Sequence, residues 1–142
     1  MEALHLTAPR TTRAGDLFTL SCAVTLPGRD PQELWITSNR EGVKDRADAF
    51  VALSLLPAMK LGVPLVSEAP VSRSLLENGL PQIQRIYRLW RMDPWNTAHP
   101  EYHPIQVRAD AIDDIDAGRA VGCFYSGGVD SSFSLVDAAD EI

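Results

Sequence analysis

Residues 120–136 limit the fold of this chain more than any other stretch of its 142 residues. Residues 120–125 form a mostly apolar run of the kind that a short, buried strand of a parallel sheet shows. Gly127 and Gly128 interrupt this run, and residues 131–136 then begin a pattern that can be helical. Adjacent glycines let the backbone turn with positive φ, and the first N–H groups of a helix have no partner within it. A strand, a glycine turn and a helix in this order therefore predict an anion-binding site.

Polar side chains around the two glycines favour phosphate as the anion. The hydroxyls of Ser126, Ser131 and Ser132 add hydrogen-bond donors. Asp130 adds a carboxylate that could hold the Mg²⁺ carried by a phosphate group. A turn that only connects two elements would need neither Asp130 nor the serines.

Two other motifs with a glycine turn fit the sequence poorly. A Walker phosphate loop needs a Gly-Lys pair, and the chain contains none. A hydrolase nucleophile elbow would make Ser126 the nucleophile, but it needs a glycine where Phe124 stands. It also needs an acid and a histidine downstream, where only ten residues follow the loop.

The segment Ser126-Gly127-Gly128-Val129-Asp130-Ser131-Ser132 resembles the signature loop of the ATP pyrophosphatases, the PP-loop family, at every position of the pattern Ser-Gly-Gly-x-Asp-Ser. This family of adenine nucleotide alpha hydrolase-like proteins includes the asparagine, GMP, NAD and argininosuccinate synthetases, tRNA thiolases, lysidine synthetase and 7-cyano-7-deazaguanine synthases. The resemblance implies a doubly wound parallel sheet and cleavage of ATP between its α and β phosphates, with adenylation of a substrate oxygen and release of pyrophosphate. It also implies that these seven residues bind the pyrophosphate part of ATP and that Asp130 lies near the Mg²⁺. It assigns no catalytic residue.

The composition is typical of a soluble globular protein, with 45% hydrophobic and 23% charged residues. No apolar run approaches the roughly 18 residues that a membrane span needs. The first five residues lack the basic start and apolar core of a secretory signal, so we expect a cytoplasmic protein. Cys22 and Cys123 each lie in an apolar, strand-like run, which favours buried free thiols over a disulfide.

The negative charge is concentrated near the predicted phosphate loop. Residues 109–142 contain eight acidic residues and one arginine, so this part has a net charge of −7, against −6 for the whole chain. ATP bound there would need Mg²⁺ and basic groups from other parts of the protein.

Two groups of side chains elsewhere have the spacing of a binding site. Arg85, Arg88 and Arg91 recur at three-residue steps on a predicted helix, which indicates a solvated face, with an acidic ligand or nucleic acid as the alternative. His99 and His103 are four residues apart, but Pro100 between them argues against the helix that a metal site of this spacing requires.

Strands and helices alternate along the rest of the chain. The segments with strand patterns are 4–7, 18–26, 34–37, 64–68 and 105–109, and the first three read as an antiparallel meander with a turn at 11–16. The helical patterns are 45–61, 70–79 and 81–91. Apolar residues cover more than one face of the first helix, which predicts that it is largely buried, although Pro57 would kink it. Gly62 and the pair Asn78-Gly79 are expected to end the first two helices.

These elements predict an α/β fold in two parts. Residues 1–112 form an N-terminal α/β module, and the resemblance implies that residues 113–142 begin a PP-loop nucleotide-binding domain. An acidic linker is expected at 110–118. A doubly wound sheet needs several further βα units, so we expect the chain to be the N-terminal part of a larger, ATP-dependent adenylating enzyme of the ligase, amidotransferase or thiolase type. The alternative is a non-catalytic binding or dimerisation module with a vestigial phosphate loop. The acceptor substrate and the oligomeric state stay open.

Overall fold

The computed structural model describes residues 2–39, 46–90 and 102–114, which form a mixed sheet with two α-helices and confirm the expected α/β class. The strands are β1 (Leu4–Leu6), β2 (Arg10–Ala14), β3 (Leu17–Thr25), β4 (Gln32–Ser38), β5 (Leu65–Ser67), β6 (Val71–Ser72), β7 (Val107–Arg108) and β8 (Ala111–Ile112). The helices are α1 (Asp48–Leu61), the π-helical segment η1 (Leu75–Gly79) and α2 (Leu80–Trp90).

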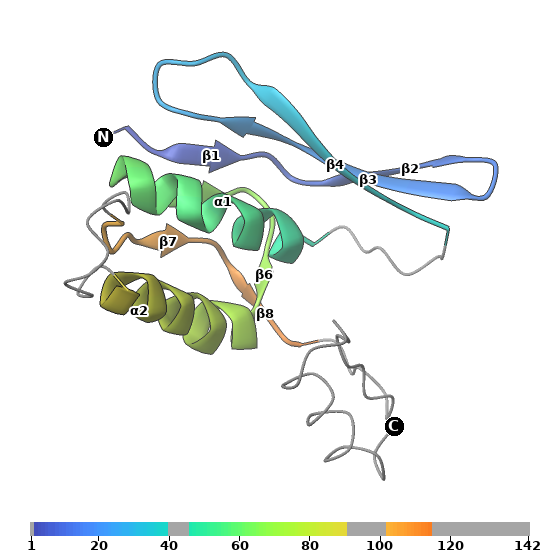
Figure 1. The fold of residues 1–142 in the computed structure, drawn as a ribbon. Coiled ribbons are helices and arrows are strands. Elements are labelled where there is room, and N and C mark those ends of the chain that lie inside the picture. The colour runs from blue at the N-terminus through green and yellow to red at the C-terminus, as the bar shows by residue number, and fades with distance from the viewer. Residues whose placement is uncertain (1, 40–45, 91–101, 115–142) are drawn as a thin grey trace, which may run out of the picture.

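The sheet combines an antiparallel ribbon with a parallel half. β3 pairs antiparallel with β1, β2 and β4, while β1, β5 and β7 are parallel to one another. The parallel pairing of β5 with β7 continues as that of β6 with β8, and the Val71 N–H donates to the carbonyl of Asp110 at 2.9 Å. In Figure 1 the ribbon of β2, β3 and β4 projects beyond the helices.

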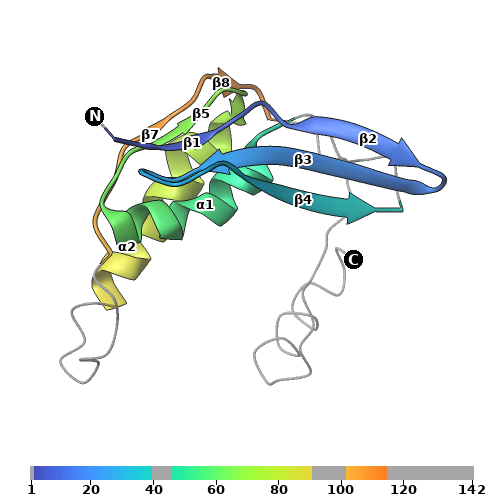
Figure 2. The same cartoon turned by 90° about the horizontal axis from the view of Figure 1, so that it is seen from above.

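Both helices cover the same side of the sheet, as Figure 2 shows. β3 has the alternation expected of it, with Leu20, Cys22 and Val24 buried against the helices. Phe50, Val51, Leu55, Ala58 and Met59 of α1 are fully buried and meet these strand residues in one core.

The predicted turn at residues 11–16 is wrong, because most of it is strand β2. Arg10 pairs with Ser21 and Ala14 with Leu17, which leaves a turn at Gly15 and Asp16 with a Gly15 φ of 61°. All five residues of β2 are exposed, so the strand has no alternation between apolar and polar side chains to reveal it.

The helix predicted to open at residue 70 and to end at Asn78-Gly79 is also wrong. Val71 and Ser72 form β6, and the helical chain then continues through η1 into α2 without a break. The Leu80 N–H reaches the carbonyl of Leu75, five residues earlier. Pro81 has no N–H and its ring would crowd the carbonyl of Glu77 in a regular helix, which the wider π turn avoids.

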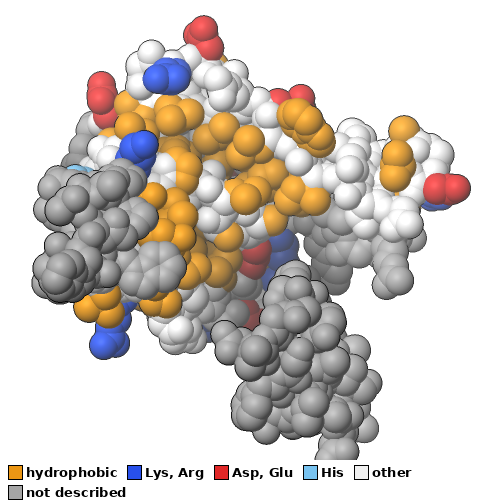
Figure 3. Space-filling model, in the orientation of Figure 1, with side chains coloured by type: hydrophobic (Ala, Val, Ile, Leu, Met, Phe, Trp, Pro, Cys, Tyr) orange, Lys and Arg blue, Asp and Glu red, His pale blue; other side chains and the backbone are white. Residues whose placement is uncertain are grey.

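The prediction that α1 is largely buried is wrong for the side of the helix that faces away from the sheet, which is exposed. Leu53 is 60% exposed and Leu61 is 50% exposed, because the sheet packs against only one side of this helix in the described part of the chain. Hydrophobic side chains gather over this face in Figure 3. The helix contains Pro57 and ends as expected, since Gly62 takes a left-handed φ of 67° and its N–H bonds to the carbonyls of Ala58 and Met59.

The acidic linker predicted at 110–118 begins too early. Ala111 and Ile112 form β8 and pair with β6, and they therefore belong to the N-terminal module. The predicted strand at 105–109 is shorter, with β7 at Val107–Arg108. Neither α-helix of the described part has the length and apolar character that a membrane crossing requires.

Candidate functional site

The predicted phosphate loop lies outside the described residues. This applies to Ser126, Gly127, Gly128, Val129, Asp130, Ser131 and Ser132, and also to Cys123, Arg91 and His99. Arg85 and Arg88 are exposed on α2, and Cys22 is a buried free thiol. Within residues 2–39, 46–90 and 102–114, no three His, Cys, Asp or Glu side chains gather closely enough to hold a metal ion.

The described residues contain a different feature, a β-bulge between β1 and β2. Leu6 pairs with Val24 and Arg10 pairs with Ser21, so three residues of one strand stand opposite two residues of β3. The Thr7 N–H bonds to the carbonyl of Ala23 at 3.0 Å, which leaves Ala8 and Pro9 opposite Cys22. An extra residue of this kind re-aims the side chains that follow it.

The bulge places Arg10 on the open face of the sheet. Leu4 and Leu6 point into the core, and strict alternation would send residue 10 to the same side. The extra residue reverses this alternation, so that Pro9 is buried and Arg10 is exposed beside Ser21.

Side chains satisfy the backbone amides at the bulge. The Ala8 N–H donates to Oε2 of Glu68 at 3.3 Å, and the Ala23 N–H donates to Oγ1 of Thr7 at 3.0 Å. Glu68 directly follows β5, and its own N–H bonds to the carbonyl of Leu6 at 3.0 Å. The positions of Glu68 and Thr7 are therefore fixed by the sheet itself.

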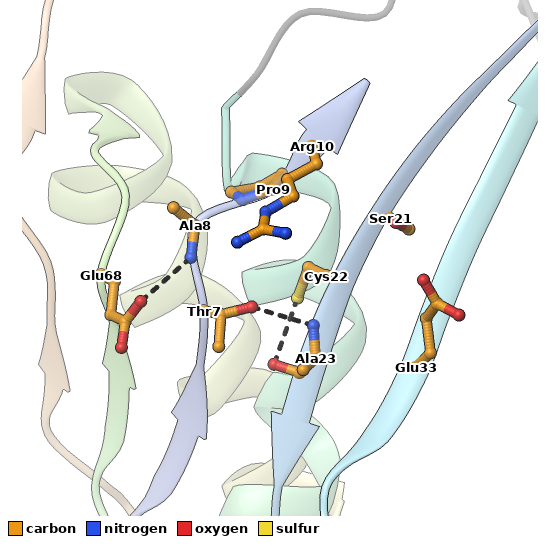
Figure 4. Close-up of a pocket in the computed structure, with 9 residues that line it drawn as sticks. All are labelled: Thr7, Ala8, Pro9, Arg10, Ser21, Cys22, Ala23, Glu33 and Glu68. Atoms are coloured by element: carbon orange, nitrogen blue, oxygen red, sulfur yellow. Dashed lines mark hydrogen bonds between the residues drawn. The ribbon is translucent and has the colours of Figure 1, made fainter. Parts of the chain in front are cut away.

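A hollow of about 410 Å³ opens at this point, where β2 continues into the ribbon and β5 turns into β6. It lies at the carboxyl ends of the parallel strands β1 and β5, which is the usual place for ligands in open α/β sheets. Figure 4 shows the Arg10 guanidinium turned back over the hollow, with Glu68 on one side and Glu33 of β4 on the other.

Cys22 lines the hollow, but its thiol is not a nucleophile. Burial raises the pKa of its thiol, so the thiol stays protonated at neutral pH. Its Sγ–H donates to the carbonyl of Ala23 at 3.5 Å. No pattern in the sequence points to this hollow, although Pro9 next to a strand is compatible with a bulge.

A second polar cluster holds the carboxyl ends of β6 and β8. Asp48 of α1 accepts hydrogen bonds from the Ser72 N–H at 3.2 Å and from the Ser72 hydroxyl. Asp114 accepts from the Ser74 N–H at 3.2 Å and from the Ser74 hydroxyl at 2.8 Å. These contacts tie both strand ends to the helical layer.

Two arginines lie at the same strand ends. Arg46 Nη1 donates to the carbonyl of Asp113 at 3.1 Å, and Arg73 Nη2 lies 3.6 Å from the Asp113 carboxylate. Arg73 also pairs with Glu77 of η1 at 3.3 Å. The two arginines therefore offset part of the acidic charge at the point where the described module ends.

No protein-family model, curated protein or solved structure matches this chain.

Proposed function

We propose that this chain belongs to an ATP-dependent adenylating enzyme of the ATP-pyrophosphatase type, which converts ATP to AMP and pyrophosphate in the cytoplasm. The observation that carries the proposal is the segment from Ser126 to Ser132, with its apolar run before and its helical pattern after. In this proposal residues 1–112 are the N-terminal module, and the domain that begins at 113 binds ATP.

The residues of the loop have the chemistry that pyrophosphate release requires. In adenylation an oxygen of the acceptor bonds to the α phosphate of ATP, and the bond between the α and β phosphates breaks. The acceptor oxygen can then leave as part of AMP, and the departing pyrophosphate needs its developing charge neutralised. Backbone N–H groups around Gly127 and Gly128 and the serine hydroxyls would hold the phosphates, and Asp130 would hold the Mg²⁺. The magnesium ion supplies charge neutralisation when bound.

The acidic charge around the predicted loop sets a requirement for the proposal. Residues 109–142 have a net charge of −7, which repels a polyanion such as ATP. Arg46 bonds to the Asp113 carbonyl and Arg73 is already paired with Glu77 and Asp113, so Mg²⁺ and further basic groups would have to offset the charge of ATP.

The second candidate is a non-catalytic binding or dimerisation module with a vestigial loop. The exposed apolar face of α1 and α2 favours it, because Leu53, Leu61, Ile86 and Leu89 are each at least 44% exposed. Large exposed apolar patches are a common mark of contact surfaces.

Pyrophosphate release by the full-length gene product, with and without Asp130→Asn, tests the proposal. The wild type should release pyrophosphate in the presence of ATP, Mg²⁺ and an acceptor-containing extract, and Asp130→Asn should lower the rate by about tenfold or more at low Mg²⁺. The urea midpoint should stay the same, because the change replaces a carboxylate by an amide of equal size.

Asp16→Asn, in the exposed β2–β3 turn, is the matched control and should leave the rate unchanged. Equal turnover of wild type and Asp130→Asn at low and at high Mg²⁺ would remove Asp130 from the mechanism. No release by the wild type would favour the binding module.

A further inference from the structure

We propose that the hollow at the β1–β2 bulge binds a small zwitterion of the α-amino acid class, with Arg10 on its carboxylate and Glu33 on its ammonium group. The residues that line this hollow include none of the predicted phosphate loop, and the proposed binding needs no ATP. The argument rests on the charges that face the hollow and on the backbone that holds them.

Arg10 supplies the group for an anion. Its guanidinium extends over the hollow and has no hydrogen-bond or ion-pair partner among the described residues. A guanidinium stays charged at every physiological pH, and its planar fork of N–H donors matches the two oxygens of a carboxylate. An unpaired Arg aimed into a hollow therefore favours a ligand that carries a carboxylate.

The two glutamates restrict which anions fit. Glu33 and Glu68 flank Arg10 from opposite sides, so the three side chains together give the hollow a formal charge of −1. A phosphate or a dicarboxylate would meet Arg10 but would be repelled by both glutamates. A ligand with one carboxylate and one ammonium group meets charges of the opposite sign at both ends.

The two glutamates have different parts in this arrangement. Oε2 of Glu68 is already engaged by the Ala8 N–H, which fixes the carboxylate against the bulge. The Glu33 carboxylate has no hydrogen-bond or ion-pair partner within the described ranges. Both of its oxygens can therefore accept hydrogen bonds from an ammonium group.

A free hydroxyl hydrogen and the size of the hollow complete the site. Oγ1 of Thr7 accepts the Ala23 N–H, which leaves the Thr7 hydroxyl hydrogen to donate to a ligand oxygen. The volume of about 410 Å³ lies within the range of small-molecule sites, roughly 300 to 1,000 Å³. Because hydrogen bonds at the bulge already hold Thr7 and Glu68, the side-chain ordering needed on binding is confined to Arg10 and Glu33.

The test is a ¹H–¹⁵N NMR titration of the 142-residue chain with glycine, L-leucine and L-glutamine, each to tens of millimolar. At least one of them should shift the amide signals of Ala8, Arg10 and Ala23 in a saturable way. The N-acetylated and the amidated form of that amino acid each lack one charge, and each should bind about tenfold or more weakly.

Two pairs of variants assign the charges. Arg10→Gln should weaken binding by about tenfold or more, whereas Arg29→Gln, in the exposed β3–β4 turn, should have no effect. Glu33→Gln should weaken binding of the free amino acid but not of its N-acetylated form. Glu2→Gln, another exposed glutamate, is its control.

The proposal is overturned if none of the three amino acids shifts these amides in a folded wild-type sample. It is equally overturned if the blocked forms bind as well as the free amino acid, or if Arg10→Gln retains full binding. Pyrophosphate release has no bearing on any of these outcomes, so the two proposals fail independently.

Discussion

Asp48 joins α1 to the sheet through one half-buried carboxylate. Its two oxygens accept the Ser72 N–H at 3.2 and 3.3 Å, and one of them also accepts the Ser72 hydroxyl. Asp48 lies in the first turn of α1, where the helix dipole favours a negative charge. Both effects stabilise the same charged group, so its removal should be costly.

We expect Asp48→Ala to lower the free energy of unfolding by about 2 kcal/mol, because the Ser72 N–H loses a charged acceptor. Asp30→Ala, at an exposed position in the β3–β4 connection, should change it by less than about 0.5 kcal/mol. Urea unfolding followed by circular dichroism measures both. Equal midpoints for the two variants would show that the Asp48 contacts contribute nothing to stability.

Features that follow from a local sequence pattern were predictable, such as which side of a strand is buried. The orientation of side chains that depends on strand register was not. The alternation of Leu20, Cys22 and Val24 predicted the buried face of β3, and Gly62 predicted the end of α1. The orientation of Arg10 was not predicted, because it is set by the bulge opposite Cys22. That bulge depends on the register between the β1–β2 segment and β3, which local sequence does not reveal. The phosphate loop stays a prediction.

At the level of elements, α1 shows that apolar content predicts a helix without predicting what covers it. Leu55 and Leu53 are two residues apart on this helix, yet Leu55 is 0% exposed and Leu53 is 60% exposed. The sequence pattern could not separate them, since apolar residues occur on every side of the helix.

This difference gives a matched pair of substitutions. Leu55→Ala should lower the free energy of unfolding by about 2 to 5 kcal/mol, because it leaves a cavity between α1 and the sheet. Leu53→Ala removes the same atoms from an exposed position and should change it by about 0.5 kcal/mol or less. Thermal and urea unfolding both report the difference. A large loss for Leu53→Ala would mean that its side chain is covered in solution.

β2 and η1 were missed for related reasons. A strand with no buried face lacks the period of two that reveals strands, and among the described strands β2 pairs only with β3. Asn78-Gly79 is a common stop signal, but the five-residue hydrogen bond of η1 lets the helical chain pass through it.

Over the whole molecule, the described chain is a two-layer unit with both helices on one side of the sheet (Figure 2). The strands diverge after β1 and β5, and this divergence separates two polar regions. The hollow at Arg10 lies on the open face of the sheet, whereas the cluster of Asp48, Ser72, Ser74 and Asp114 lies at the ends of β6 and β8. The second region fixes the chain immediately before the predicted nucleotide-binding domain.

Limited digestion with trypsin tests where the N-terminal module ends. Arg108 lies in β7, where it pairs with Val66, whereas Arg119 follows the acidic stretch predicted as a linker. Each arginine is followed by alanine, so the two peptide bonds are chemically alike. A protease needs an extended, accessible backbone. Because β7 pairs with β5 and β8 pairs with β6, the peptide bond after Arg108 is not accessible to trypsin until these strands separate. We therefore expect cleavage after Arg119 to precede cleavage after Arg108, with the early fragment 1–119 detected by mass spectrometry.

Asp114→Ala removes the acceptor of both Ser74 hydrogen bonds and should narrow this difference in rate, because it loosens the end of β8. Cleavage after Arg108 first in the wild type would show that β7 and β8 do not close the module.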